Sequence, residues 1–280
     1  MKGRTILRRA DIRDFKQLAE LRKKLFGEFN PARFISYINE NPDLVLVILE
    51  NERVVGYCIG IVLSEGKGSI YQIGVDKRSL NKGYRKRLLD SIIDALKRRR
   101  CREITAGFVA EESRGFFLKH GFRIQETLLG HEKTDFFTPL KGNQLLLIRP
   151  FESDDLEDLL ELEQKCFEPF WHTTRDEFIR WSKLPEASFF VGIMNKKVVA
   201  YNFNTIREKT GHYARIAVHP DYRRQRIGTR LTINAIEWFK KKGVKKILLN
   251  TQVDNIEARG MYEKLGFRIL EKLYVMILDI

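Results

Sequence analysis

A chain of 280 residues is long enough for one large domain or two ordinary ones, and its 43% hydrophobic and 31% charged residues describe a globular protein with a buried core. No apolar run is long enough to cross a bilayer and the N-terminus lacks an apolar signal segment, so we expect a cytoplasmic protein with no membrane partner. Three unclustered cysteines and five scattered histidines exclude a disulfide framework and predict no metal site.

The opening segment, residues 6–26, reads as a short strand, an acidic helix cap and an amphipathic helix. The same pattern returns at residues 147–167, at an offset of 141. The matched residues are Arg8 and Arg149, Asp14 and Asp155, and Phe26 and Phe167. The chain therefore begins a second copy of its first element halfway along its length.

The repeat extends through the rest of both halves. Residues 44–58, two strands joined by a polar turn, match residues 189–201. The strand at 71–75 matches 214–218, and a later segment, 114–122, matches 259–267. We therefore predict two copies of one domain, residues 1–140 and 144–280, with a boundary near the polar turn segment that begins at Pro139.

Each half reads β-α-α-β-β-β-α-β-α-β-β, which predicts the α/β class: a mixed, mostly antiparallel twisted sheet with helices on both faces. In the second half, the strands that end near Val218 and Val253 should form a central parallel pair. The helical pattern at 231–242 would join them in a right-handed crossover.

The charge of the chain is strongly basic, with a formal net value of +14. Residues 77–102 alone contain eleven lysines or arginines against Asp90 and Asp94. One hypothesis is that the basic first half binds RNA, a ribosome or an acidic protein. The alternative is a solvated helix face, because charge is the sole sign of nucleic-acid binding there.

The stretch from Ile216 to Leu231 reads as a strand, a basic turn and the start of a helix, with Gly228 at the transition. Free N–H groups at a helix N-terminus and the helix dipole favour a phosphate at such a place. The cationic side chains nearby are those of Arg223, Arg224, Arg226 and Arg230. An ordinary strand–helix connection with solvated arginines is the alternative.

A second stretch, from Leu248 onward, reads as a strand, a short helix from about Asn255 and another strand after Gly266 and Phe267. The two stretches together resemble the GNAT superfamily of acyl-CoA N-acyltransferases. The family motif of Asn followed seven residues on by Tyr-x-x-x-Gly-Phe matches this second stretch, with Tyr262 at its centre.

The family also has a loop, Arg/Gln-x-x-Gly-x-Gly/Ala, that binds the pyrophosphate of coenzyme A. It matches residues 223–228, with Arg226 in place of the first glycine. The resemblance covers essentially the whole chain, strongly in the second half and weakly in the first. It implies that the strands ending near Val218 and Val253 splay apart, and that the pantetheine arm of acetyl-CoA enters the gap.

The resemblance implies a role for each matching residue. Main-chain groups of 216–218 would bind the pantetheine arm as an added strand does, and N–H groups of 224–229 would hold the pyrophosphate. Asn255 would orient the cofactor near its thioester, unless it is an ordinary part of a helix cap in which Asp254 and Glu257 form a capping box. The predicted cofactor-binding residues are Ile216, Ala217, Val218, Arg223, Arg224, Gln225, Arg226, Ile227, Gly228, Thr229, Asn255 and Tyr262.

Tyr262 is the predicted catalytic residue, a general acid that protonates the coenzyme A thiolate; the alternative is a core tyrosine. The acceptor would be a primary amine that attacks acetyl-CoA directly. The second half also resembles the enzymes that acetylate the N-terminal alanine of a ribosomal protein, including a segment that matches 166–171. Those enzymes carry a basic glutamate where this chain has Asn250, and an amide is no base. Water relayed to backbone carbonyls, or to His212, Tyr213 or Glu168, remains open as a substitute.

The first half has lost the matching residues. Leu80 stands where the second half has Arg223, and Arg85 stands at the place of Gly228. A bulky residue there should block the approach of a pyrophosphate. Ala110 and Phe117 replace the asparagine and the tyrosine of the later motif. We therefore predict that the first half is catalytically silent.

These observations predict an acetyl-CoA-dependent N-acetyltransferase whose active half is the second one, acting on a protein N-terminus or a small-molecule amine. Two other classes stay open. In one, the chain is a non-catalytic module that senses acetyl-CoA; in the other, it is an adaptor associated with RNA or the ribosome.

Overall fold

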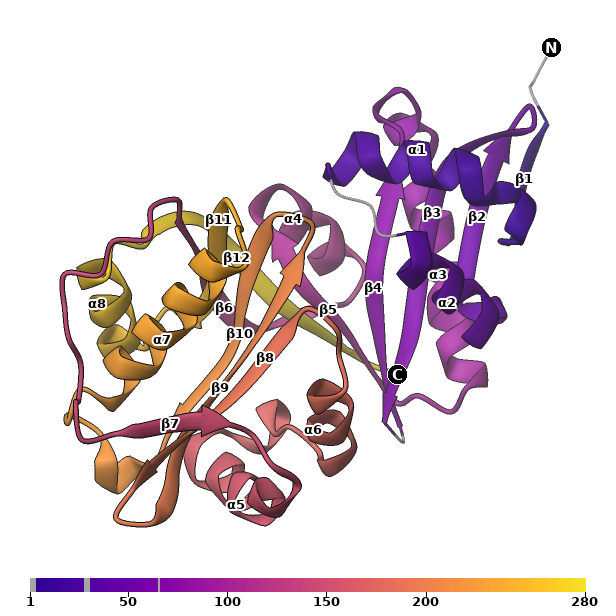
Figure 1. Ribbon diagram of the computed structural model, residues 1–280. Coiled ribbons are helices and arrows are strands. Elements are labelled where there is room, and N and C mark those ends of the chain that lie inside the picture. The colour runs from indigo at the N-terminus through magenta and orange to yellow at the C-terminus, as the bar shows by residue number, and fades with distance from the viewer. Residues whose placement is uncertain (1–3, 28–30, 65) are drawn as a thin grey trace. The chain divides into compact units, whose positions relative to one another are not determined.

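The computed structural model describes residues 4–27, 31–64 and 66–280, and the chain divides into two compact units (Figure 1). Unit 1 contains residues 1–127 and 273–280, and unit 2 contains residues 128–272. The units differ from the two halves of the sequence because each half gives the end of its last strand to the other unit. No helix in the described residues is long and apolar enough to cross a membrane.

The first half of the sequence forms six strands and four α-helices in the described residues. In chain order they are β1 (Thr5–Arg9), α1 (Phe15–Phe26), α2 (Pro31–Glu40), β2 (Val45–Glu50), β3 (Arg53–Ser64), β4 (Lys67–Val75), α3 (Tyr84–Arg98), β5 (Glu103–Ala110), α4 (Glu111–Lys119) and β6 (Arg123–Lys133). Short 3-10 turns precede α1, β2 and α3, at Ile12–Asp14, Pro42–Leu44 and Lys77–Lys82.

The second half repeats this order. Its elements are β7 (Leu147–Pro150), α5 (Leu156–Cys166), α6 (Arg175–Ser182), β8 (Ala187–Met194), β9 (Lys197–Arg207), β10 (Thr210–Val218), α7 (Ile227–Lys241), β11 (Lys246–Gln252), α8 (Ile256–Lys264) and β12 (Arg268–Asp279). Its 3-10 turns are Ser153–Asp155, Pro169–Trp171 and Pro220–Tyr222. The predicted tandem repeat and mixed α/β fold are therefore confirmed.

The prediction of two strands at the end of each half was wrong. Each half ends in one long strand, β6 or β12. In the second half the reason is visible in the sequence, since residues 268–278 contain no glycine, proline, asparagine or aspartate that would turn the chain.

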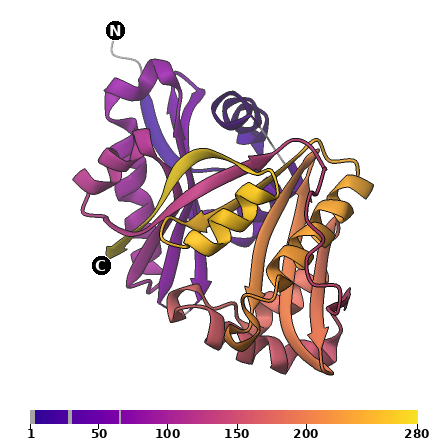
Figure 2. The same ribbon diagram turned by 90° about the vertical axis from the view of Figure 1, so that its left-hand side faces the viewer.

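The two long strands are exchanged between the halves. In unit 1, residues 273–279 of β12 pair antiparallel with β5. In unit 2, residues 128–133 of β6 pair antiparallel with β11. Figure 2 shows the yellow end of β12 running beside the strands of the first half of the chain, where its neighbour is β5.

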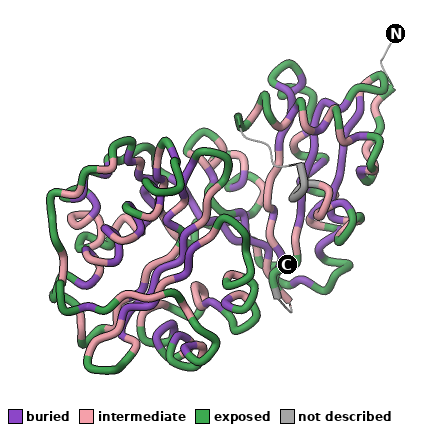
Figure 3. Tube along the Cα trace, in the orientation of Figure 1, coloured by how far each residue is buried: buried purple, intermediate pink, exposed green. Residues whose placement is uncertain are grey.

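Each unit is a mixed sheet covered on both faces. The strand order is β1-β2-β3-β4-β5-β12 in unit 1 and β6-β11-β10-β9-β8-β7 in unit 2. Within each unit, the β4–β5 and β10–β11 pairs are parallel, and the other pairs described residue by residue are antiparallel. In unit 2, α7 and α8 pack on one face of the sheet and α5 and α6 on the other, and the strands between them are largely buried (Figure 3).

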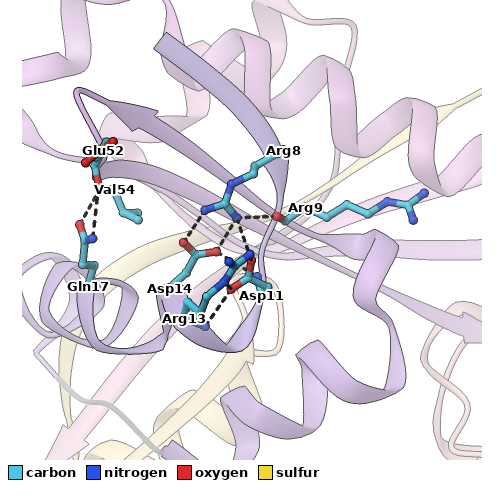
Figure 4. A network of polar contacts seen from close by, with 8 residues as sticks. All are labelled: Arg8, Arg9, Asp11, Arg13, Asp14, Gln17, Glu52 and Val54. Atoms are coloured by element: carbon cyan, nitrogen blue, oxygen red, sulfur yellow. Dashed lines mark hydrogen bonds and ion pairs between the residues drawn. The ribbon is translucent and has the colours of Figure 1, made fainter. Parts of the chain in front are cut away.

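The start of each copy is fixed by the matched arginine and aspartate. Arg8 makes two hydrogen bonds to Asp14, of 2.6 and 2.7 Å, and Asp14 also accepts from the backbone N–H of Asp11 (Figure 4). Arg149 binds Asp155 in the same way, at 2.7 and 2.6 Å. A buried carboxylate that closes the 3-10 turn before the helix and pairs with a strand arginine therefore sets the first helix of each unit against its sheet.

Candidate active site

The predicted gap between two parallel strands is present in unit 2. β10 and β11 are paired only from Thr210 to His212, opposite Lys246 to Leu248. Beyond His212, a bulge interrupts the ladder at Ala214, and β10 continues to Val218 with β9 as its partner. Because β10 loses its pairing to β11 while keeping β9, its main chain over 216–218 faces the gap with one edge.

The carbonyl group of Val218 already has protein partners. It accepts from the thiol of Cys166 at 3.3 Å and from Nε of Arg223 at 3.4 Å. Arg223 thus turns back onto the strand. These contacts place Arg223, the first arginine of the loop, beside Val218. The binding of pantetheine by the main chain of residues 216–218 stays a prediction.

The basic loop leads directly into α7. The helix begins at Ile227, and its N-cap residue, Arg226, has φ 58° and ψ 22° and makes no side-chain capping bond. The first N–H groups of the helix are therefore left without a side-chain cap, which is the arrangement that favours an anion. Arg226 occupies the left-handed region that favours glycine, at a cost of about 1–2 kcal/mol for a side-chain-bearing residue.

The second glycine of the loop lies where α7 approaches α8. A Cβ on Gly228 would come within 3.3 Å of the sulfur of Met261. In unit 1 the matching residue is Arg85, whose guanidinium lies 4.1 Å from the centre of the Phe116 ring and 5.7 Å from that of Phe117. Burial lowers the pKa of Arg85. The place that is bare in unit 2 is thus occupied in unit 1 by a guanidinium stacked on aromatic rings.

Asn255 is the N-cap of α8. Its side-chain oxygen accepts from the backbone N–H of Ala258 at 3.1 Å. The expected capping box with Asp254 as its cap was wrong, because the helix begins one residue later. The other expected member, Glu257, pairs instead with Arg224 and so joins the basic loop to the first turn of α8. A cofactor contact by Asn255 stays a prediction.

Tyr262 lies two turns into α8 and is 3% exposed. Its ring packs against His131, Tyr213 and Phe267, with ring centres 5.9, 6.4 and 5.7 Å away. Within the described chain its hydroxyl makes no hydrogen bond to protein. Burial, followed by the nearby Tyr213, raises its pKa well above the usual value, so the phenol keeps its proton at neutral pH.

The structure separates the three open candidates for a base. Tyr213 shares a hydrogen bond of 3.2 Å with Thr232, and burial raises its pKa, so it is a poor base. Glu168 is exposed in the loop after α5. His212 lies at the last paired residue before the gap, and its buried Nε2 has no hydrogen-bond partner among the described residues.

Sequence reasoning missed two residues that support α8, both from the exchanged strand β6. His131 packs on the ring of Tyr262, with its Nδ1 3.0 Å from the carbonyl of Leu129. The ammonium of Lys133 lies 2.7 Å from where a Cβ on Gly266 would be, beside the C-terminus of α8, where the helix dipole favours a cation. Neither residue stands in a motif, because both belong to the other half of the sequence.

Known proteins place this chain in a family. The model of the acetyltransferase (GNAT) family matches residues 15–122 and again 156–267. The chain therefore belongs to the GNAT family, and with two such domains it is a tandem GNAT N-acetyltransferase. This family uses acetyl-CoA as a co-substrate.

Individual relatives are similar over one copy or over both. N-alpha-acetyltransferase 30 of Schizosaccharomyces pombe is 33% identical over 139 residues, which are 46% of this chain and 89% of the relative. A putative ribosomal protein bS18-alanine N-acetyltransferase of Bacillus subtilis is 28% identical over 122 residues, 43% of this chain and 80% of the relative. A solved tandem GNAT protein from the clavulanic acid biosynthesis pathway has a TM-score of 0.77 at 13% identity, over 99% of this chain and 98% of that one, and so shares its fold.

Proposed function

We propose that unit 2 transfers the acetyl group of acetyl-CoA to the free amino group of a protein N-terminus, and that unit 1 is not catalytic. The observation that carries the proposal is the contrast at one position of the repeat. Gly228 has no side chain at the start of α7 in unit 2, where even a Cβ would press on the Met261 sulfur, whereas Arg85 is stacked on Phe116 at that place in unit 1.

The binding part of the proposal rests on the helix N-terminus and the gap. Uncapped N–H groups at the start of α7 would hold the pyrophosphate of acetyl-CoA, and the open edge of β10 over 216–218 would bind its pantetheine arm. The absence of a side chain at Gly228 lets the backbone of α7 come close to the ligand.

The chemical part of the proposal assigns one role to Tyr262. Acetyl-CoA supplies the acetyl group as a thioester, and the neutral amine attacks the thioester carbonyl directly. As the carbon–sulfur bond breaks, the Tyr262 hydroxyl donates its proton to the departing thiolate. The raised pKa of Tyr262 keeps that proton in place until it is needed. The proton of the amine passes to water or to a base; Nε2 of His212 is a candidate because it has no hydrogen-bond partner among the described residues, but burial lowers its pKa and makes it a weak base.

A protein N-terminus is preferred to a small amine as the acceptor. The names of two relatives support this choice, since one is an N-alpha-acetyltransferase and the other is a putative alanine N-acetyltransferase of a ribosomal protein. The basic first half offers no observation beyond its charge that favours RNA as a partner.

The experiment is an assay of coenzyme A thiol release from acetyl-CoA with peptides of varied N-termini and with a panel of small amines. Turnover should occur with peptides, and Tyr262→Phe should lower kcat by at least about tenfold while acetyl-CoA still binds. Turnover with small amines only would correct the acceptor. Binding of acetyl-CoA without turnover on any acceptor would favour the sensing module instead.

A further inference from the structure

The segment that connects the two halves lies against the basic loop of unit 2. The side-chain Nδ2 of Asn143 donates to the carbonyl of Gln225 at 2.9 Å, and the backbone N–H of Asn143 donates to the carbonyl of Arg226 at 3.1 Å. The remaining side-chain atom of Asn143, Oδ1, accepts from the N–H of Leu145 at 2.8 Å. One residue thus holds two successive carbonyl groups of the loop that precedes α7.

The segment is pinned on both sides of Asn143. Before it, Gly142 has φ 67°, and a Cβ there would come within 2.6 Å of the backbone of Arg230. After it, Leu146 is buried in a cluster that includes Ile227 and Leu231 of α7. The close approach at Gly142 and the apolar anchor at Leu146 fix the position from which Asn143 donates.

Holding these carbonyls also directs N–H groups. In a planar trans peptide, the C=O and the N–H point in opposite directions. Asn143 fixes the carbonyl of Gln225, and it shares the carbonyl of Arg226 with the N–H of Arg230 in α7, which donates to it at 3.1 Å. These bonds turn the N–H groups of Arg226 and Ile227 to the opposite side of the loop. These are two of the N–H groups expected to hold the pyrophosphate.

The same contacts explain how an arginine is kept where the family loop has glycine. Both Arg224 and Arg226 have positive φ, at 61° and 58°, a conformation that side-chain-bearing residues rarely adopt. Such a conformation persists where the surroundings over-determine it. The two bonds from Asn143 to the carbonyls on either side of Arg226 provide that restraint.

We propose that Asn143 is a positioning residue for acetyl-CoA: from the connecting segment it holds the 223–228 loop in the conformation that presents its N–H groups to the pyrophosphate. This inference rests on the proposed function of unit 2. The connecting segment lies outside both sequence motifs, yet through Asn143 it would take part in binding the ligand.

The test compares three variants of the full chain. Asn143→Asp keeps the acceptor for Leu145 but replaces the N–H donor with a carboxylate oxygen facing a carbonyl. Asn143→Ala removes both. Gln144→Ala is the matched control, because Gln144 bonds only to Lys141 and Gly142 in its own segment, at 2.6 and 3.4 Å.

Two measurements are made on each variant. The first is the Kd of coenzyme A by calorimetry, which we expect to rise about tenfold in both Asn143 variants and to stay unchanged in the control. The second is turnover with two acetyl donors. The KM for acetyl-CoA should rise with little change in kcat, whereas kcat/KM for S-acetylpantetheine, which has the thioester without the pyrophosphate, should stay the same.

The outcomes separate this inference from the proposed function. If wild-type protein does not bind coenzyme A, the proposed function fails and this inference fails with it. If wild type binds and the Asn143 variants bind equally well, only the positioning role is overturned. An equal loss with both donors also overturns it, because that result indicates general damage to unit 2.

Discussion

The two units join their first helix to the sheet at matching positions, by an ion pair in unit 2 and by an arginine–amide contact in unit 1. In unit 2, Arg215 on β10 bonds Glu163 on α5 at 2.5 Å, and the hydroxyl of Tyr201 also bonds Glu163. Arg215 further donates to the carbonyl of Trp171 and lies 3.7 Å from the ring centre of Phe167. This buried network ties α5 and the loop after it to the sheet.

Unit 1 has the same network with the cation on the helix. Arg22 on α1 donates to Gln72 on β4 at 2.6 Å, and Tyr57 donates to the same oxygen at 2.8 Å. Because the unit that has lost the motif residues keeps these contacts, we assign a structural role to them in both units. The buried Glu163 is therefore a partner of Arg215 and no catalytic base.

His212 should make the stability of the protein depend on pH. Burial, and then the charges of Arg207 and Lys246, lower its pKa from 6.5 to about 4. Folding thus favours the neutral imidazole. The full free energy of unfolding is therefore present above pH 6.5, and up to about 3 kcal/mol of it is lost as the pH falls toward 4. Urea unfolding of wild type and of His212→Gln at pH 7 and pH 4.5 measures this. The variant should lose less stability on acidification, and an identical loss would contradict the prediction.

At the scale of elements, the parallel pair of unit 2 separates beside α7. The parallel pair in unit 1 also separates, since β4 and β5 are paired only over residues 67–70 and 103–106. The strands of unit 1 therefore keep the family geometry while Arg85 fills the space between α3 and α4. The difference between the two units at this place therefore lies in the side chains rather than in the backbone.

An arginine at the same position of unit 2 should block the binding of coenzyme A there. Gly228→Arg would bring a guanidinium between α7 and the Met261 sulfur, where there is no room for a Cβ without displacement. Binding of coenzyme A, measured by calorimetry, should weaken by at least about tenfold. Arg85→Gly is the control and should leave binding unchanged. Undiminished binding in Gly228→Arg would mean that the ligand does not pass between these helices.

Most elements and the parallel pair could be predicted from the sequence, because hydrophobic periodicity and the internal repeat act within short stretches. The partner of the last strand could not. Lys133 of β6 pairs with Ile247, and Leu278 of β12 pairs with Ile104 at the matching place of the other unit; alternation along a strand sets its faces and does not name its partner. His131 contacts Tyr262, and Asn143 contacts the 223–228 loop, only because the fold brings distant segments together. Neither residue stands in a sequence motif, so the sequence could not predict these contacts.

At the scale of the whole molecule, the basic first half uses part of its charge internally. Lys82 pairs with Glu50, Lys86 with Asp90 and Arg99 with Asp43. Together with the stacked Arg85, these pairs account for four of the eleven basic residues between 77 and 102. Binding of RNA or of an acidic protein by this half stays a prediction, and these contacts reduce the charge available for it.

The exchanged strands predict how fragments behave. Residues 144–280 lack β6, so the outer edge of β11 is uncovered and Tyr262 and Gly266 lose their contacts with His131 and Lys133. We expect this fragment to aggregate, because an open sheet edge recruits other strands. Residues 128–272 contain every paired strand of unit 2 and should stay monomeric and melt cooperatively. Size-exclusion chromatography and thermal melts followed by circular dichroism compare the two, and equal behaviour would be evidence against this account.

The exchange also sets the order in which the protein is completed during synthesis. A tandem protein made of independent domains can finish its first domain while the ribosome is still making the second. In this chain, the strand that completes the sheet of unit 1 beside β5 is residues 273–279. Unit 1 is therefore held unfinished until residues 273–279 are made, and its closure pairs them with residues 103–110, far away in the sequence. Contacts of such long sequence separation slow folding, so a nascent chain of this protein depends on protection for longer than its domain size suggests.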